Sequence, residues 1–144
     1  MASTHIAHDC LVGDNVILSN LATLGGHVQI GNWAILGGGV LVHQFTQIGE
    51  HSLIGGGFRA VQDVPPFIIA ANYPLEYKGV NIVGLKRRGF SKKDIYSIKK
   101  AYRGFFRSRM NRKTAIEKIE SEFPKTKVIQ KILDFIKHSN RGII

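Results

Sequence analysis

Residues 6–59 divide into nine hexapeptides: IAHDCL, VGDNVI, LSNLAT, LGGHVQ, IGNWAI, LGGGVL, VHQFTQ, IGEHSL and IGGGFR. Every first position is isoleucine, valine or leucine, and glycine fills six of the nine second positions. An aliphatic residue that recurs at a fixed period is typical of a solenoid, in which each repeat adds one short strand and one corner. The period therefore predicts a parallel β-helix with three hexapeptides in each coil.

The same pattern predicts which side chains face the interior. The aliphatic first position and the often small fifth position are expected to fill each coil, so we interpret the fifth-position residue Cys10 as part of the core. We attribute the second-position glycines to corners where glycine relieves steric limits on the backbone. Coils are expected to stack by parallel strand pairing, about 4.8 Å apart.

The β-helix is expected to end at Val64-Pro65-Pro66, because proline removes donors from a strand ladder. We therefore predict a hexapeptide β-helix over residues 1–66, an irregular connecting segment over 67–90 and a helical C-terminal domain over 91–144. Ser91 and Asp94 form a capping box at the start of the first long helix. A second helix is expected over about 114–123, and a third contains the apolar stripe between Val128 and Ile136.

Composition limits the classes of protein to consider. The net charge is +10, and it is unevenly distributed: residues 1–85 sum to −3 and residues 86–144 to +13. The single cysteine excludes an internal disulfide framework. No apolar run approaches the roughly 20 residues of a membrane-spanning helix, and the N-terminus lacks the pattern of a signal peptide. These features favour a cytoplasmic protein with a polyanionic partner, and the lack of an aromatic-basic motif disfavours nucleic acid.

Three histidines are expected to share one face of the β-helix. Every third hexapeptide lies on the same face, and three such repeats contain His8, His27 and His43, whereas His51 falls on another face and His5 precedes the first full repeat. Histidine is suited to proton transfer near neutral pH.

Three interpretations of these histidines remain open. They could cap turns, bind a metal, or act in general-base catalysis along a substrate groove. A metal site needs ligands that converge within about 2.1 Å of one ion. Because the three histidines occupy different positions within their repeats, we expect a row rather than a cluster. We therefore favour general-base catalysis, with no metal and no cofactor.

Several motifs together resemble a known family, the UDP-N-acetylglucosamine O-acyltransferases that open lipid A synthesis. The motifs are HIAHDC (5–10), GGHVQIG (25–31), VHQF (42–45), QDVPP (62–66) and GVNIVGLKRRGF (79–90). The resemblance covers essentially the whole chain. It implies a left-handed β-helix, a homotrimer and an enzyme that transfers a 3-hydroxyacyl group from acyl carrier protein to the glucosamine 3-hydroxyl of UDP-N-acetylglucosamine.

The resemblance also implies roles for individual residues. His8 matches the general base, Asp9 matches a residue that orients it, and the Gly26 N–H matches an oxyanion donor. Matches to substrate contacts, or to the groove that holds the substrate, are His5, His27, His43, Gln44, Asn81, Arg87 and Arg88. Gly38 and Gly56 lie in stacked glycine triplets and are expected to leave a groove for the acyl chain. The basic helical part is expected to bind the acidic carrier protein.

Two departures from the family pattern are visible. Members of the family carry further β-helix coils before the HIAHD segment, which this chain lacks, and Val83 stands where the family often has a glutamate near the base of the nucleotide. The alternatives to the acyltransferase are a related enzyme for another nucleotide sugar, a catalytically silent truncated trimeric scaffold, and a metal-dependent hydratase on the same helix.

Overall fold

The structure is a computed structural model, which describes residues 1–108 and 110–144. The chain divides into two compact units, Met1–Asn81 with Ser139–Ile144, and Ile82–His138. Within the described residues, no helix is both long and apolar enough to cross a membrane.

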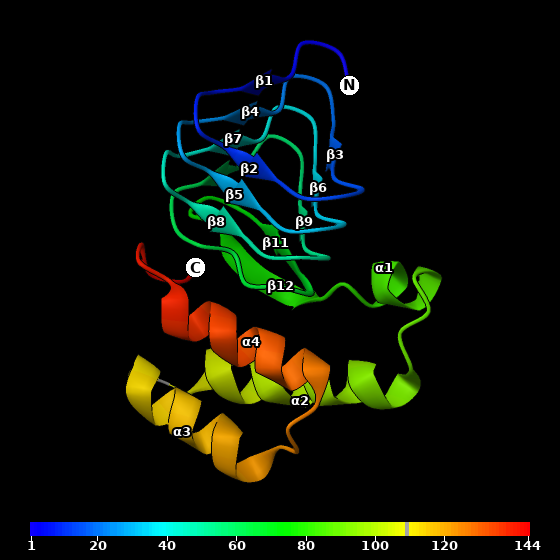
Figure 1. Cartoon of the computed structure of the whole chain (residues 1–144), viewed down its shortest axis with the longest axis vertical. Coiled ribbons are helices and arrows are strands. Elements are labelled where there is room, and N and C mark those ends of the chain that lie inside the picture. Colours follow the sequence, from blue (N-terminus) through cyan, green and yellow to red (C-terminus); the bar gives the residue numbers. More distant parts are fainter. Residues whose placement is uncertain (109) are drawn as a thin grey trace. The chain divides into compact units, whose positions relative to one another are not determined.

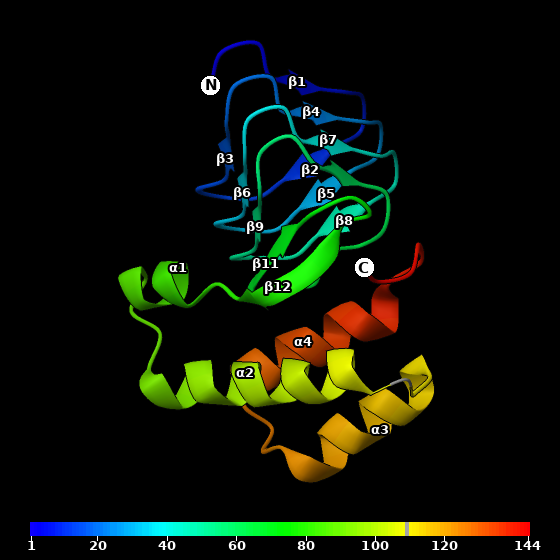
Figure 2. The same cartoon turned by 180° about the vertical axis from the view of Figure 1, so that it is seen from behind.

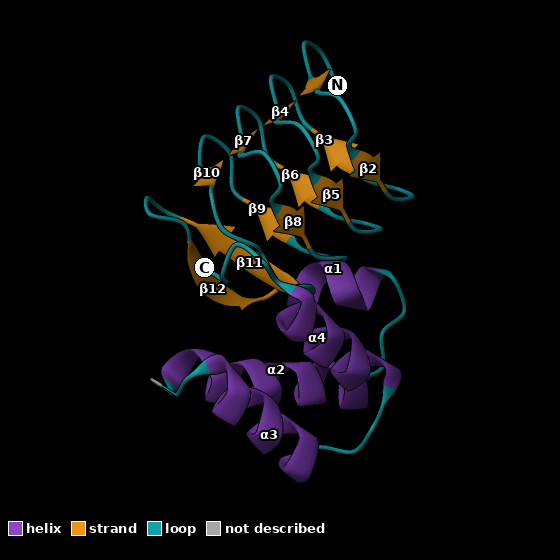
Figure 3. Ribbon diagram, turned by 60° about the vertical axis from the view of Figure 1, so that its left-hand side comes forward, coloured by secondary structure: helices purple, strands orange, loops and turns teal. Residues whose placement is uncertain are grey.

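The first unit is a parallel β-helix, as the hexapeptide period predicts. Figures 1 and 2 show its coils from opposite sides. Its short strands are β1 (His5–Ile6), β2 (Leu11–Val12), β3 (Ile17–Leu18), β4 (Thr23–Leu24), β5 (Gln29–Ile30), β6 (Ile35–Leu36), β7 (Leu41–Val42), β8 (Gln47–Ile48), β9 (Leu53–Ile54) and β10 (Arg59–Ala60). Three sheets result, with the parallel orders β1-β4-β7-β10, β2-β5-β8 and β3-β6-β9 (Figure 3). Ile6 pairs with Leu24, and Leu24 pairs with Val42, so equivalent hexapeptides stack directly.

The interior of the coils follows the predicted pattern. First-position Leu24 and Leu36 are fully buried, and so are the small fifth-position residues Ala22 and Ala34. Cys10 is only half-buried, because it belongs to the first coil. Its thiol donates to the Gly25 carbonyl at 3.1 Å, so its role in the core is partial.

The corners differ from our expectation. In every hexapeptide the fourth residue, not the second, has a positive φ: Asp9, Asn15, Leu21, His27, Trp33, Gly39, Phe45, His51 and Gly57. The second-position glycines are needed because neighbouring coils approach closely there. A Cβ on Gly25 would lie 2.7 Å from the Gln44 nitrogen, and one on Gly31 would lie 2.5 Å from the Glu50 nitrogen.

The two prolines do not end the β-helix. Val64 bridges Ile48 in parallel, and β11 (Ile68–Ala71) then pairs in parallel with β9. The prolines fit because the turn they precede needs no donor from them: the Phe67 N–H donates to the Glu50 carbonyl at 2.9 Å. β12 (Glu76–Val80) follows antiparallel to β11. Residues 67–90, predicted to be irregular, thus contain two strands and the helix α1 (Ile82–Arg87).

The last six residues return to the β-helix, although we predicted a helical domain over 91–144. Their anchor is the buried carboxylate of Asp63, which accepts from the Ser139 hydroxyl at 2.5 Å and the Arg141 N–H at 3.4 Å. The Gln47 N–H donates to the same carboxylate at 2.8 Å. Gln47, Ser139 and Arg141, which are far apart in the sequence, therefore all donate hydrogen bonds to one buried carboxylate.

The second unit is helical. α2 (Lys92–Arg107) begins as predicted, with the Asp94 N–H donating to the Ser91 hydroxyl at 3.0 Å. α3 (Arg112–Glu122) begins earlier than predicted, because Asn111 accepts from the Thr114 N–H at 2.8 Å and caps it. α4 (Lys127–His138) buries the apolar stripe that the sequence indicates. α1, α2, α3 and α4 are labelled in Figure 1.

Candidate functional site

The candidate site is built on one corner of the β-helix, where the turns after β1, β4 and β7 stack. Asp9, His27 and Phe45 are the fourth residues of the hexapeptides that form these turns, and they have φ values of 59°, 59° and 64°. The His27 N–H donates to the His8 carbonyl at 3.0 Å, and the Phe45 N–H donates to the Gly26 carbonyl at 2.9 Å. These bonds join consecutive coils and hold the three turns in one column.

The left-handed turn brings His8 and Asp9 together, although neighbours in a strand point to opposite faces. His8 Nδ1 lies 2.9 Å from Asp9 Oδ2, and His27 Nε2 lies 3.7 Å from the same oxygen. The His8 and His27 rings meet edge to face at 5.1 Å. His8 and Asp9 are 73% and 66% exposed and His27 is 43% exposed, so the group is open to a ligand.

The electrostatics of this group determine which nitrogen of His8 accepts a proton. The hydrogen bond with His8 lowers the pKa of Asp9, and the charge of His27 adds to the effect. Asp9 is therefore a carboxylate near neutral pH, and it accepts the Nδ1–H of His8. In a neutral imidazole the other nitrogen then carries the free lone pair. Nε2 of His8 is thus available as a base.

Gly26 lies directly against this nitrogen. A Cβ on the buried Gly26 would come within 2.8 Å of His8 Nε2 and 2.7 Å of His8 Cε1. Among the residues that the structure describes, the Gly26 N–H has no hydrogen-bond acceptor. A proton acceptor therefore lies next to the residue whose N–H is uncommitted, and acyl transfer requires these two kinds of group.

The remaining predicted residues of the β-helix are more dispersed. His43 shares the corner one coil farther along, where its Nδ1 is 3.2 Å from the Gln44 carbonyl oxygen, and the Gln44 side chain is exposed. His5 is exposed on β1. Asn81 is buried and donates from Nδ2 to the His51 carbonyl at 3.0 Å. The structure thus forms a cluster of His8, Asp9 and His27 rather than the expected row of three histidines.

Arg87 and Arg88 belong to the helical unit. Arg87 is the last residue of α1, and Arg88 follows it directly. Burial lowers the pKa of the Arg88 guanidinium, and the like charge of Arg87 contributes less. Arginine remains charged near neutral pH despite such a shift, so both residues offer planar donor groups to an anion.

At another corner of the β-helix, the turns after β6 and β9 consist of glycine and carry no side chains. Gly39 and Gly57 have φ values of 73° and 81°, which glycine adopts without strain. Gly38 and Gly56 are exposed, and neither has a positive φ. A Cβ on Gly56 would lie 3.2 Å from the Gly38 carbonyl oxygen, which is tight but not prohibitive. The two glycines leave a strip without side chains.

Sequence reasoning missed Phe45. It is 53% exposed, and its ring stacks on the His27 imidazole at 4.7 Å with an angle of 8° between the planes. Its place in the VHQF motif, at the repeat position that His27 occupies one coil earlier, was the available signal.

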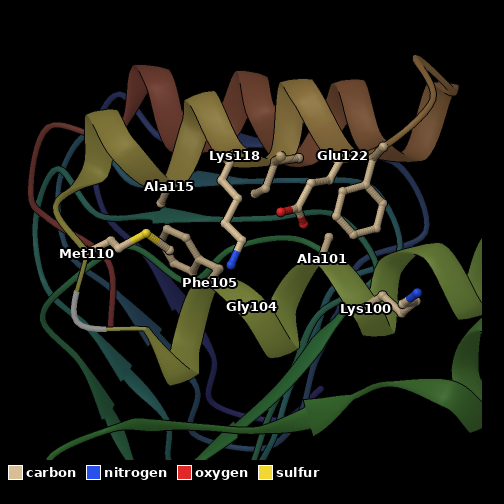
Figure 4. A pocket seen from close by; sticks show the side chains of 10 residues that line it. Lys100, Ala101, Gly104, Phe105, Met110, Ala115, Lys118 and Glu122 are labelled. Carbon is tan, nitrogen blue, oxygen red and sulfur yellow. The ribbon is translucent and has the colours of Figure 1, made fainter.

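The helical unit contains a small apolar slot that the sequence did not predict. The slot, of about 50 Å³, lies between α2 and α3, and its lining includes Ala101, Phe105, Met110, Ala115 and Ile119 (Figure 4). A wider groove of about 410 Å³ adjoins it, and we call its four exposed cations the α2–α3 basic surface: Lys100, Arg103, Arg107 and Lys118.

Two known protein families match parts of this chain. Residues 63–144 match the family described as "Udp N-acetylglucosamine O-acyltransferase; Domain 2". Residues 9–44 match the bacterial transferase hexapeptide repeats.

Comparison with individual proteins points the same way. The chain is 47% identical, over 99% of its length, to the acyl-[acyl-carrier-protein]–UDP-N-acetylglucosamine O-acyltransferase of Aliivibrio salmonicida, and covers 54% of that protein. The solved UDP-N-acetylglucosamine acyltransferase of Bacteroides fragilis is 44% identical with a TM-score of 0.96, over 99% of this chain and 56% of that one. The corresponding Moraxella catarrhalis enzyme is 40% identical with a TM-score of 0.93, over 98% and 55%. The chain thus spans about half the length of the relatives it matches.

Proposed function

Because the chain belongs to the UDP-N-acetylglucosamine O-acyltransferase family, we propose that it carries the acyl-transfer site of that reaction. The reaction moves a 3-hydroxyacyl group from acyl carrier protein to the glucosamine 3-hydroxyl of UDP-N-acetylglucosamine. The single observation that carries this proposal is the contact of Asp9 with His8 Nδ1 at 2.9 Å, which leaves Nε2 as a base beside the Gly26 N–H.

In the proposed reaction, His8 Nε2 takes the proton of the sugar hydroxyl as its oxygen attacks the thioester carbonyl. The charge that develops on the carbonyl oxygen is stabilised by the Gly26 N–H. When the tetrahedral intermediate collapses, the carbon–sulfur bond breaks and the imidazolium returns its proton to the departing thiolate. Asp9 stabilises the imidazolium through Nδ1–H during both steps.

We assign the substrate contacts as follows. His27 and Gln44 bind the sugar, His43 and His5 border the same groove, and Arg87 with Arg88 binds the diphosphate through planar, charge-assisted hydrogen bonds. Stacking on Phe45 supports this role of His27, since it fixes the ring. We place Asn81 with the same substrate contacts, and its Nδ2 hydrogen bond to the His51 carbonyl holds the buried side chain in place. Gly38 and Gly56 form the floor of the acyl groove.

The basic helical unit is the proposed binding surface for the carrier protein. An acidic partner would meet the α2–α3 basic surface, while the apolar slot beside it accepts a small aliphatic side chain. We also propose a cytoplasmic location, consistent with the lone Cys10 thiol.

We further propose that the chain assembles as a homotrimer. Large apolar side chains project outward from the β-helix, among them Leu11, which is 66% exposed, and Leu41, which is 46% exposed. Burial of such residues against neighbouring copies would stabilise a closed ring. Light scattering at micromolar concentration measures the assembly directly, and a monomer would contradict it.

The proposed reaction is tested by replacing the base. His8→Ala should lower acyl transfer from carrier-protein thioester to UDP-N-acetylglucosamine by about 10²–10⁴-fold. Folding should be unchanged, because the side chain is 73% exposed. The control is His138→Ala at the exposed end of α4, since His51 is buried and stacks on Phe67. Full activity in His8→Ala would refute the assignment, and an inactive native chain would favour the silent scaffold.

A further inference from the structure

The corner that carries the proposed base also has the composition of a metal site. His8, Asp9 and His27 each offer one ligand atom, and these three atoms lie within 4.8 Å of one another. We propose that this corner binds one zinc ion per chain through these three side chains, and that the bound ion switches off the base. Binding itself does not depend on acyl transfer, whereas the switching rests on the proposed function.

The distances need only small adjustments to ligate zinc. With zinc–ligand bonds of about 2.0–2.1 Å at tetrahedral angles, ligand atoms lie about 3.4 Å apart. Asp9 Oδ2 is 2.9 Å from His8 Nδ1 and 3.7 Å from His27 Nε2, which brackets that spacing. The histidine nitrogens lie within 4.8 Å of each other, and rotation of the exposed His8 imidazole closes the remaining gap. Because the corner is open, water completes the coordination.

The donor set favours zinc over the abundant hard cations. Two imidazole nitrogens with one carboxylate oxygen suit zinc and neighbouring late transition metals, whereas magnesium and calcium prefer oxygen ligands alone.

Two structural features pre-organise the ligating side chains before a metal binds. His27 stacks on Phe45 at 4.7 Å, which fixes the plane of the imidazole. The hydrogen bond from the His27 N–H to the His8 carbonyl, at 3.0 Å, fixes the spacing of the two coils. Support of this kind around a ligand usually raises metal affinity.

The ion would switch off the base through the tautomer of His8. Without metal, the proton of the neutral ring sits on Nδ1, and Nε2 accepts. Zinc at Nδ1 uses that lone pair, so the neutral ring must carry its proton on Nε2, where no acceptor remains. The site can therefore hold zinc or remove a proton from the substrate, but not both at once.

Calorimetric titration of the chain with zinc chloride, in a non-chelating buffer at constant pH, tests the binding. We expect one zinc per chain. Asp9→Asn and His27→Ala should each weaken the affinity at least tenfold, about the lower limit seen on loss of outer supporting groups. Cobalt gives a second readout, because its visible spectrum reports the ligand field. Circular dichroism verifies that the variants fold.

Two control variants locate the ion. Cys10→Ala removes the nearby thiol, and His43→Ala removes the other histidine of the corner; both should keep the affinity for zinc. Equal affinity in the native chain and in folded His27→Ala would overturn the site, as would loss of binding in Cys10→Ala.

The switching is tested in the acyl-transfer assay. Zinc at concentrations that saturate the calorimetric site should inhibit the transfer, and a chelator should restore it. Saturating zinc without inhibition would overturn the switching. A chain that binds zinc but transfers no acyl group in metal-free buffer would contradict the proposed function alone, because the calorimetry establishes the site independently.

Discussion

At the scale of single residues, backbone conformation makes the proposed chemistry possible. A residue with positive φ is costly unless it is glycine, asparagine or aspartate, yet His27 and Phe45 adopt it. The hydrogen bonds between coils compensate for this cost, because each such residue donates its N–H to the coil before it. In return, Asp9 turns back toward His8, a contact that an extended strand would not permit.

Gly26 provides the most direct test of this arrangement. In Gly26→Ala the new Cβ would lie 2.7 Å from His8 Cε1, closer than real contacts allow, so the exposed imidazole must move. Misplacing a catalytic group by about 1 Å can cost roughly 10²-fold in rate. We expect kcat to fall by about that factor, with little change in KM or in thermal stability. Steady-state kinetics with circular dichroism measures all three, and an unchanged kcat would mean that His8 is not the base.

Sequence reasoning assigned these residues to one corner but did not predict how they meet. The histidines were assigned to one face from the repeat alone, and the roles of Asp9 and Gly26 came from family resemblance. The clustering of His8, Asp9 and His27 was not foreseen, because it depends on the left-handed turn, and the period does not reveal φ. Phe45 was missed for the same reason, since a fourth-position aromatic looks like any other exposed side chain.

At the scale of elements, the glycine corner carries a prediction about the acyl donor. Glycine is needed at position 37 because the next coil approaches closely, and at position 39 because φ is positive. Gly38 and Gly56 are not required in the same way, since a Cβ on either would lie no closer than 3.2 Å to its neighbours. We therefore propose that the bare strip they form holds the acyl chain, and we predict a long 3-hydroxyacyl donor rather than a ten-carbon one.

Substitution at Gly56 tests this interpretation. In Gly56→Met the side chain would cover the strip, so the variant should prefer shorter donors, and Gly56→Ala should lie between it and the native chain. Each buried methylene contributes about 0.8 kcal/mol, so the loss of four changes selectivity by about two orders of magnitude. The measurement is the ratio of kcat/KM for carrier-protein donors of different length. If all three proteins show the same ratio, the glycines serve only the backbone.

The elements that the sequence failed to predict share a physical reason. Pro65 and Pro66 looked like a stop signal, but a corner needs no donor from them, so the solenoid continues into β11. β12 pairs with β11 and the last residues pair near Asp63, and no local pattern announces such distant partners. The start of the α2 helix was predicted because its capping box is a local signal.

At the scale of the whole molecule, the two parts of the chain differ in net charge and in proposed role. Residues 1–85 sum to −3 and residues 86–144 to +13, so the cations lie almost entirely outside the β-helix. The proposed chemistry is carried by the β-helix, while the helical unit holds the proposed surface for an acidic protein. Such a field accelerates encounter with an acidic partner and is screened by salt, with a Debye length of about 10 Å at 0.1 M.

Reversal of charge on the α2–α3 basic surface should therefore selectively weaken the binding of the carrier protein. In the double variant Arg103→Glu with Lys118→Glu, two exposed cations become repulsive, and we expect the KM for the carrier-protein thioester to rise about tenfold at low salt. The KM for the nucleotide sugar should stay the same.

The control is Lys93→Glu with Lys125→Glu, which changes the net charge equally but lies outside that surface. Raising the salt from about 0.05 M to about 0.5 M should weaken the native interaction and reduce the difference between the variants. Equal effects of the two double variants would indicate that only net charge matters, and a KM independent of salt would exclude electrostatic binding of the carrier protein.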